Sequence, residues 1–153
     1  MTPEDQPGFD PRLSWAAEGA VVLAQVCPVL VVVDVLRFTT AVEVAVGRGA
    51  RVVPLPWPGR EAPARGASGS GPYSLSPVSL LDVPAGTRVE LASPNGATVS
   101  LAAARAGAVV LAGCVSGREL AARGRAADLR LAAEHDVSRV VPRLAGGGFA
   151  QLS

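Results

Sequence analysis

The sequence predicts an α/β fold with a mostly parallel sheet and helices on both faces, in three layers. Residues 29–33 form an apolar run without alternation, which is typical of a strand buried on both faces. Two segments, 29–54 and 87–112, each follow the order strand, turn, helix, strand. Repetition of that order is typical of a doubly wound sheet.

The first half of the chain contains three predicted strands and one helix. Residues 20–26 are apolar and end at Cys27-Pro28, where proline cannot donate to a central ladder, so we expect a strand there. The strand at 29–33 follows. A helix over 40–46 then stops at Gly47-Arg48-Gly49, whose glycines supply a left-handed cap. A strand at 50–54 completes a βαβ unit with an expected right-handed crossover.

Residues 55–78 change in composition to proline, glycine, serine and arginine, which excludes a helix or a central strand. We expect a long loop that is the most mobile internal segment. Arg60, Arg65 and Tyr73 could reach a ligand from it, as in a lid or binding loop. A mobile tether without a binding role fits the composition equally well.

The second half of the chain repeats the pattern. Residues 87–92 alternate like a strand and lead into the turn Ser93-Pro94-Asn95-Gly96. A helix at 97–106 and a strand at 108–112 follow. Short helices at 119–123 and 126–135 and a last strand at 138–142 complete the predicted elements.

Length and composition predict a single domain over residues 1–153, with a polar lead-in at 1–14. The formal net charge of +1 gives no basic field for nucleic acid, so we expect no such partner. All 14 cationic side chains are arginine, which excludes lysine chemistry and favours anions held by guanidinium groups. Cys27 and Cys114 lack the count of a zinc site, and His135 lies at a predicted helix end that favours its cation.

The start of the sequence is acidic and polar and lacks the positive region of a signal peptide. The longest apolar stretch, residues 20–33, is interrupted by Gln25 and Pro28 and is shorter than the ~20 residues that span a bilayer. We therefore expect a soluble cytoplasmic protein with no membrane partner.

The candidate site follows the central strand. Asp34 stands where that strand ends, at the sheet edge where open α/β folds bind ligands. Arg37 and the possible helix caps Thr39 and Thr40 come next, which suits an anion. The turn at 93–96 occupies the equivalent place in the second unit, so Asn95 and the N–H groups beyond Gly96 are expected to face Asp34. A purely structural role for both turns is the alternative.

These segments resemble the 2-phosphosulfolactate phosphatase (ComB) family. The resemblance rests on residues 31–42, 49–54, 73–77, 93–96 and 109–114, and it covers roughly 15–114. The segment 116–153 is similar to the family's C-terminal part at 116–124 and 136–142, whereas the family's middle segment is absent from this chain. The fold is therefore incomplete relative to the family.

Family members are magnesium-dependent phosphatases that convert 2-phosphosulfolactate to sulfolactate and phosphate on the route to coenzyme M. The resemblance implies that Asp34 and Arg37 are catalytic and that Asp34 holds Mg²⁺, with nucleophilic attack by Asp34 as the alternative. It also places Arg37, Thr39, Thr40, Ser93, Asn95 and Gly96 around the phosphate of a small-molecule ester. The competing hypothesis is a non-catalytic, truncated homologue or a small-anion-binding module.

Joining the strand that ends at Cys114 directly to residues 116–123 removes elements that would cover a sheet with two apolar faces. Each uncovered Val or Leu loses about 1.5–3 kcal/mol of burial, against a total stability of about 5–15 kcal/mol. We therefore expect the chain to be marginally stable or to self-associate, and a homo-oligomer is one outcome.

Overall fold

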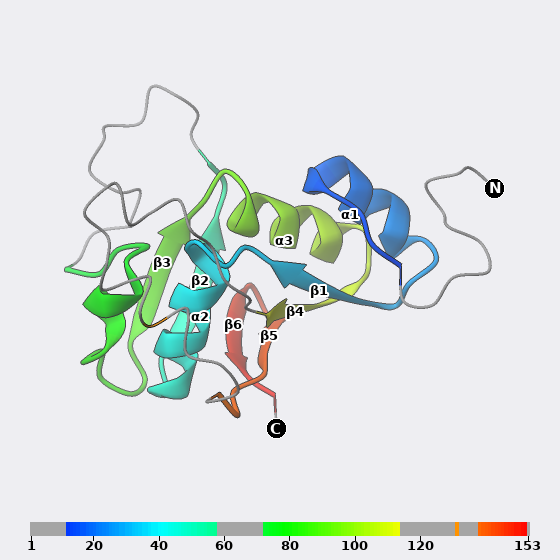
Figure 1. The fold of residues 1–153 in the computed structure, drawn as a ribbon. Helices are drawn as coiled ribbons and strands as arrows, with labels where there is room; N and C mark the ends of the chain where they lie inside the picture. The colour runs from blue at the N-terminus through cyan, green and yellow to red at the C-terminus, as the bar shows by residue number, and fades with distance from the viewer. Residues whose placement is uncertain (1–11, 58–71, 114–130, 132–137, 153) are drawn as a thin grey trace.

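The computed structural model describes residues 12–57, 72–113, 131 and 138–152 (Figure 1). Three helices, a short 3₁₀ helix and six strands make up this part of the chain. In sequence order they are α1 (Ala16–Ala24), β1 (Val29–Val33), α2 (Phe38–Gly47), β2 (Arg51–Leu55), η2 (Pro77–Leu80), β3 (Arg88–Ala92), α3 (Gly96–Arg105), β4 (Val109–Gly113), β5 (Pro142–Ala145) and β6 (Gly148–Gln151).

The six strands form one mixed sheet in the order β1-β4-β5-β6-β2-β3. β1 pairs in parallel with β4, and β2 pairs in parallel with β3. The hairpin of β5 and β6 lies between these two pairs and is antiparallel to both neighbours. The fold is α/β as expected, but the expectation of a mostly parallel sheet is wrong, since three of the five pairings between described strands are antiparallel.

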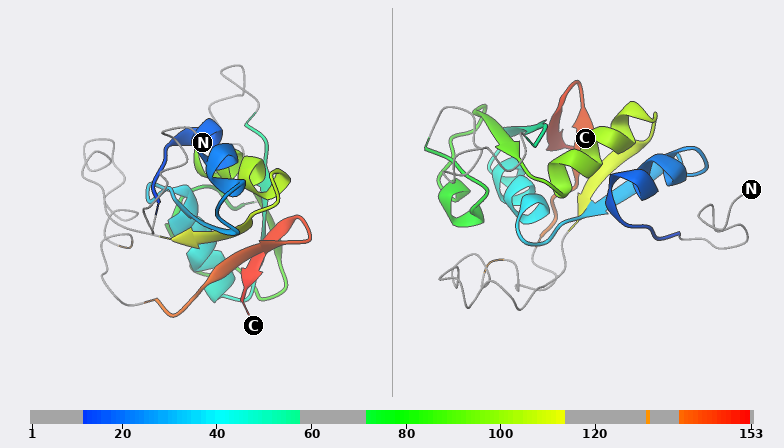
Figure 2. Two further views of the ribbon diagram at one scale, coloured as in Figure 1. Left: turned by 90° about the vertical axis from the view of Figure 1, so that its right-hand side faces the viewer. Right: turned by 90° about the horizontal axis from the view of Figure 1, so that it is seen from above.

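One row of side chains crosses the whole sheet, because directly paired residues share a face. Four residues of this row are buried and two, Leu30 and Leu144, are half-buried. The row consists of Leu30, Val110, Leu144, Phe149, Val52 and Val89. α1 and α3 pack against each other and contact β1, and Figure 2 shows both on one side of β1 and β4. α2 reaches the same face, where the rings of Phe38 and Phe149 meet edge to face with centroids 5.9 Å apart.

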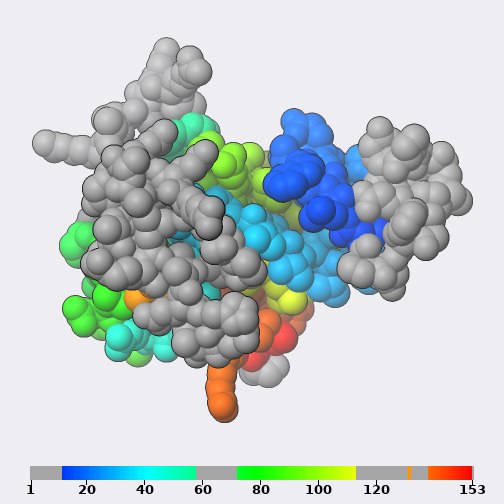
Figure 3. Space-filling view, viewed as in Figure 1, coloured from blue at the N-terminus to red at the C-terminus, as the bar shows by residue number. Residues whose placement is uncertain are grey.

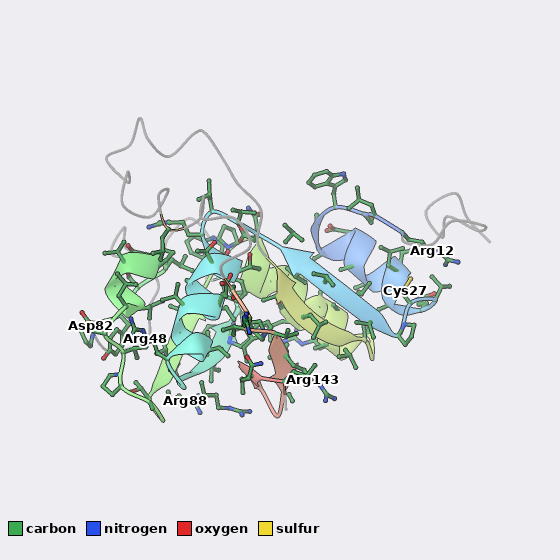
Figure 4. The ribbon with its side chains drawn as sticks, turned by 60° about the horizontal axis from the view of Figure 1, so that its bottom comes forward. Arg12, Cys27, Arg48, Asp82, Arg88 and Arg143 are labelled. Atoms are coloured by element: carbon green, nitrogen blue, oxygen red, sulfur yellow. The ribbon has the colours of Figure 1, made fainter. Side chains whose placement is uncertain are left out.

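The opposite face of the sheet is not covered to the same extent. Its row contains Val31, which is 58% exposed, a half-buried Leu111 and an exposed Arg143. In Figure 4, where the bottom of the molecule in Figure 1 is turned forward, Arg88 and Arg143 are labelled. The expectation of helices on both faces in three layers is therefore not confirmed by the described residues. β1 in particular is buried on one face only.

The expected strand at 20–26 is wrong, because residues 16–24 form α1 instead. Ala20 and Leu23, three residues apart, are the buried side chains of this helix, whereas Val21 is 38% exposed. That spacing is typical of a helix. In an apolar run of only seven residues, however, the helical and the strand periodicity cannot be told apart.

α2 begins two residues before the expected start, so Thr39 and Thr40 lie inside the helix, and neither is its N-cap. The predicted end is confirmed: Arg48 is the C-cap and Gly49 follows with a φ of 81°, a left-handed conformation that favours glycine. The predicted βαβ unit is wrong as a unit, because β1 and β2 are separated in the sheet by β4, β5 and β6.

The strand expected at 138–142 is displaced to β5, and β6 was not predicted. From the expected loop at 55–78, residues 58–71, which include Arg60 and Arg65, lie outside the described residues, as do Cys114, the segments 119–123 and 126–130, and His135. Residues 72–76 lead into η2, which already includes the last two residues of the expected loop. Tyr73 and Leu75 pack against the core. None of the helices in the described residues has the length and apolar character needed to cross a bilayer.

Candidate functional site

The Asp34 carboxylate joins the two ends of the sheet. Asp34 follows β1, and its Oδ2 accepts hydrogen bonds from Ser93 Oγ at 3.1 Å and from the Gly96 N–H at 2.8 Å. Ser93 and Gly96 follow β3, which is the opposite edge strand. The contact is possible because the sheet curls, so that the ends of β1 and β3 approach each other near the starts of α2 and α3 (Figure 1). The expected shared location of the two turns is therefore present.

The turn between β1 and α2 is held by its own hydroxyl groups. Thr39 Oγ1 accepts from the Asp34 N–H at 3.2 Å, and the Thr39 N–H donates to the Asp34 carbonyl at 2.9 Å. Thr40 Oγ1 donates to the Val35 carbonyl at 2.7 Å. Both threonines are almost fully buried, at 1% and 3% exposure. These hydroxyls fix the backbone on which Asp34 is mounted, rather than lying open to a ligand.

The turn between β3 and α3 supplies the donors to Asp34. Ser93 is 4% exposed, and its Oγ also accepts from the Asn95 N–H at 3.3 Å. Asn95 is exposed and is the N-cap of α3, without a capping bond from its own side chain. Gly96 is buried directly against Phe38, so that an added Cβ would lie 2.6 Å from the ring's Cγ. Glycine is needed here for close approach of α3 to α2.

The Asp34 carboxylate occupies the position at the start of α3 where a bound anion would sit. The Gly96 N–H and the positive end of the helix stabilise its negative charge. The Thr98 N–H and Oγ1 both donate to the Ser93 carbonyl, so these donors are also used within the turn. An incoming phosphate would therefore need a cation or a guanidinium group beside Asp34. Arg37, half-buried at the N-cap of α2, is three residues away in the chain.

The described residues fit a magnesium ion only in part. They contain no group of three or more His, Cys, Asp or Glu side chains that could hold a metal. Asp34 offers one carboxylate, whose Oδ2 takes both donors described above and whose Oδ1 is the oxygen left for a cation. Mg²⁺ commonly binds through one or two carboxylates, with water and substrate phosphate as the other ligands. The site could hold an ion that arrives with its substrate.

No protein-family model, no curated protein and no solved structure matches the chain.

The structure brings four of the expected site residues into one hydrogen-bonded cluster, which consists of Asp34, Thr39, Ser93 and Gly96. Thr40 and Asn95 border this cluster. The Thr40 hydroxyl donates to the Val35 carbonyl, next to Asp34 in the chain, and the Asn95 N–H donates to the Ser93 hydroxyl. Phe38 was not expected to be part of the site. Its place just before Thr39, on an otherwise small-residue helix start, is the only sequence signal that could have indicated it.

Proposed function

We propose that the Asp34 cluster binds and hydrolyses a small acidic phosphate monoester, similar to 2-phosphosulfolactate, in a magnesium-dependent reaction. The observation that supports this proposal best is the convergence of Asp34 with Ser93 and Gly96, which lie 59 and 62 residues away in the sequence. The mostly parallel, three-layer architecture that the sequence pattern predicts is not required, because the cluster is formed by the ends of β1 and β3.

Each described residue has a defined task in this proposal. The Ser93 hydroxyl and the Gly96 N–H hold one oxygen of Asp34, which leaves the other directed to a cation. Thr39 and Thr40 hold the backbone of the turn, and Arg37 supplies a guanidinium group for phosphate oxygens. A bound Mg²⁺ would neutralise the charge on those oxygens. The resulting site would release phosphate from a small ester without a nucleic acid or membrane partner.

A second candidate is a non-catalytic module that binds a small anion. It is favoured by the single carboxylate at the cluster and by the donors at the start of α3 that Asp34 itself engages. Such a module would bind phosphate through Arg37 without turnover. The two candidates differ in one measurable property, the release of phosphate.

The test is a phosphate-release assay on the full chain with 2-phosphosulfolactate and Mg²⁺, beside calorimetric titration with inorganic phosphate. Asp34→Asn keeps an acceptor for Ser93 and Gly96 but removes the charge, so turnover should fall at least about a hundredfold, or about 2.7 kcal/mol, with little loss of stability. Asp82→Asn, at an exposed carboxyl distant in sequence, is the matched control and should not change turnover. Phosphate binding without turnover would favour the second candidate. The absence of both phosphate binding and turnover would contradict both candidates.

A further inference from the structure

The two edges of the sheet differ in how they are protected. β3, at one edge, carries Arg88 and Glu90, whose side chains form an ion pair at 2.8 Å. β1, at the other edge, has no charged or polar side chain from Val29 to Val33. Charged side chains on an edge strand discourage pairing with another strand, whereas an apolar, uncharged edge promotes it. Figure 3 shows the atoms of the β1 segment at the surface of the molecule.

The direction of the backbone groups in β1 can be worked out from one bond. The Val109 N–H donates to the Pro28 carbonyl at 2.8 Å, so that carbonyl points towards β4. Backbone groups in a strand alternate in direction, and the groups of Leu30 and Val32 therefore also point towards β4. The N–H and C=O groups of Val29, Val31 and Val33 then point away from the sheet, where the described residues offer no strand to pair with them.

The same three valines have the exposed side chains. Val29, Val31 and Val33 are 49%, 58% and 59% exposed, whereas Val32 is 6% exposed. Each of them thus presents a backbone donor, a backbone acceptor and an apolar side chain to solvent. Another strand pairs the whole row of backbone groups and places its own side chains beside the exposed valines, whereas a helix or a small ligand leaves the row of backbone groups unpaired.

We propose that β1 pairs with β1 of a second copy of the chain, antiparallel about a two-fold axis through Val31. In this register Val31 faces its own counterpart, Val29 faces Val33, and Leu30 faces Val32. Every pair is therefore apolar, and no charged side chain of β1 opposes another across the interface. The outward groups of the three valines would form about six N–H···O bonds, two for each pair. The exposed valines of both copies would then form one continuous apolar surface.

The pairing also keeps like charges apart. Asp34 is the charged residue nearest to the strand, and it lies three residues beyond Val31. At about 3.3 Å per residue, the two copies of Asp34 would stand about 20 Å apart, on opposite sides of the axis. Each Asp34 cluster is built within one copy, so this inference does not depend on the proposed function.

Sedimentation velocity on the full chain, at about 1–100 μM, tests the proposal, and we expect a reversible dimer. Val31→Pro removes an outward N–H without breaking the ladder to β4. Val31→Lys places two lysines opposite each other at the axis, with their Cα atoms about 5.5 Å apart, so that like charges oppose the pairing. Each variant should weaken the dimer at least about tenfold. Val78→Lys, at a valine 38% exposed on η2, is the matched control and should not weaken it.

Hydrogen exchange provides a second measurement. The amides of Val29, Val31 and Val33 should exchange quickly in dilute solution and slowly at high concentration, whereas those of Leu30 and Val32 should be protected throughout. If Val31→Pro fails to fold by circular dichroism, Val31→Lys decides, because its side chain already faces solvent. A monomeric wild-type chain, or a dimer that survives Val31→Lys unchanged, would overturn the proposal.

Discussion

At the scale of single residues, the contact between Gly96 and Phe38 determines how closely α3 approaches α2. The first turn of a helix normally accepts alanine, and replacing glycine there usually stabilises a protein by up to about 1 kcal/mol. At Gly96 a Cβ would instead lie 2.6 Å from both Cβ and Cγ of Phe38, which is fully buried and cannot move into solvent. The position of the Gly96 N–H on Asp34 depends on the same contact.

We therefore expect Gly96→Ala to destabilise the chain by about 1–3 kcal/mol, opposite in sign to the helix propensity. Urea unfolding followed by circular dichroism measures the change. If the proposed function holds, phosphate release should fall as well, because α3 would shift away from Asp34. A neutral or stabilising effect would show that Phe38 can move and that the approach of the two helices is adjustable.

At the scale of secondary-structure elements, Phe149 connects the β5–β6 hairpin to α2. It is fully buried, pairs with Val52 of β2 and meets the ring of Phe38. Arg51 of β2 binds the carbonyl groups of Ala145 and Gly146 in the hairpin turn, the second at 2.8 Å. Because these Arg51 contacts with carbonyl groups are exposed to solvent, most of the hairpin's attachment energy should come from Phe149.

Phe149→Ala should reduce the free energy of unfolding by about 3–5 kcal/mol, since it leaves a cavity on the buried face. Such a loss is a large share of the ~5–15 kcal/mol typical of a domain. Leu152→Ala, at a leucine 41% exposed just beyond β6, should cost less than about 1 kcal/mol. Equal losses at both positions in chemical denaturation would contradict the central role given to Phe149.

The sequence could be used to predict those elements whose signal is local. Alternating residues indicate β3, and a run of small residues indicates α3. Gly49 marks the end of α2. α1 could not be distinguished from a strand because nearly all its residues are apolar or small. β6 contains only Gly148, Phe149, Ala150 and Gln151, and its strand form depends on pairing with residues far away in sequence. The cluster around Asp34 was predictable because each of its turns directly follows a strand.

At the scale of the whole molecule, the sheet has one buried face and one largely open face. Along β2, β3 and β5, the open face carries polar residues such as Arg51, Arg88 and Arg143, so its exposure to water costs little free energy. β1 is the exception, since its valines were expected to be covered and are not. The sequence shows that both faces of β1 are apolar. It does not show which strand forms the edge of the sheet, because strand order depends on long-range pairing.

If β1 pairs with a second copy, thermal stability should depend on protein concentration. A hundredfold increase in concentration stabilises a dimer by about 2.7 kcal/mol, or about 1.4 kcal/mol per chain, which corresponds to a rise in Tm of about 3–5 °C for a chain of this size. Differential scanning calorimetry at two concentrations measures this shift. Val31→Lys should melt at one temperature regardless of concentration. A constant Tm for the wild-type chain would argue against association through the folded state.

The position of the β5–β6 hairpin between two parallel pairs has a consequence for synthesis in the cell. The ribosome delivers β1, β2, β3 and β4 first, yet the pair β1–β4 and the pair β2–β3 are connected in the sheet only through the hairpin that follows them. If the two parallel pairs form before the hairpin emerges, their inner edges, β4 and β2, are unpaired until then. Such edges are binding sites for chaperones and for neighbouring nascent chains. Among the described strands, the sheet therefore becomes continuous only after the hairpin, which is synthesised later than its neighbours β4 and β2.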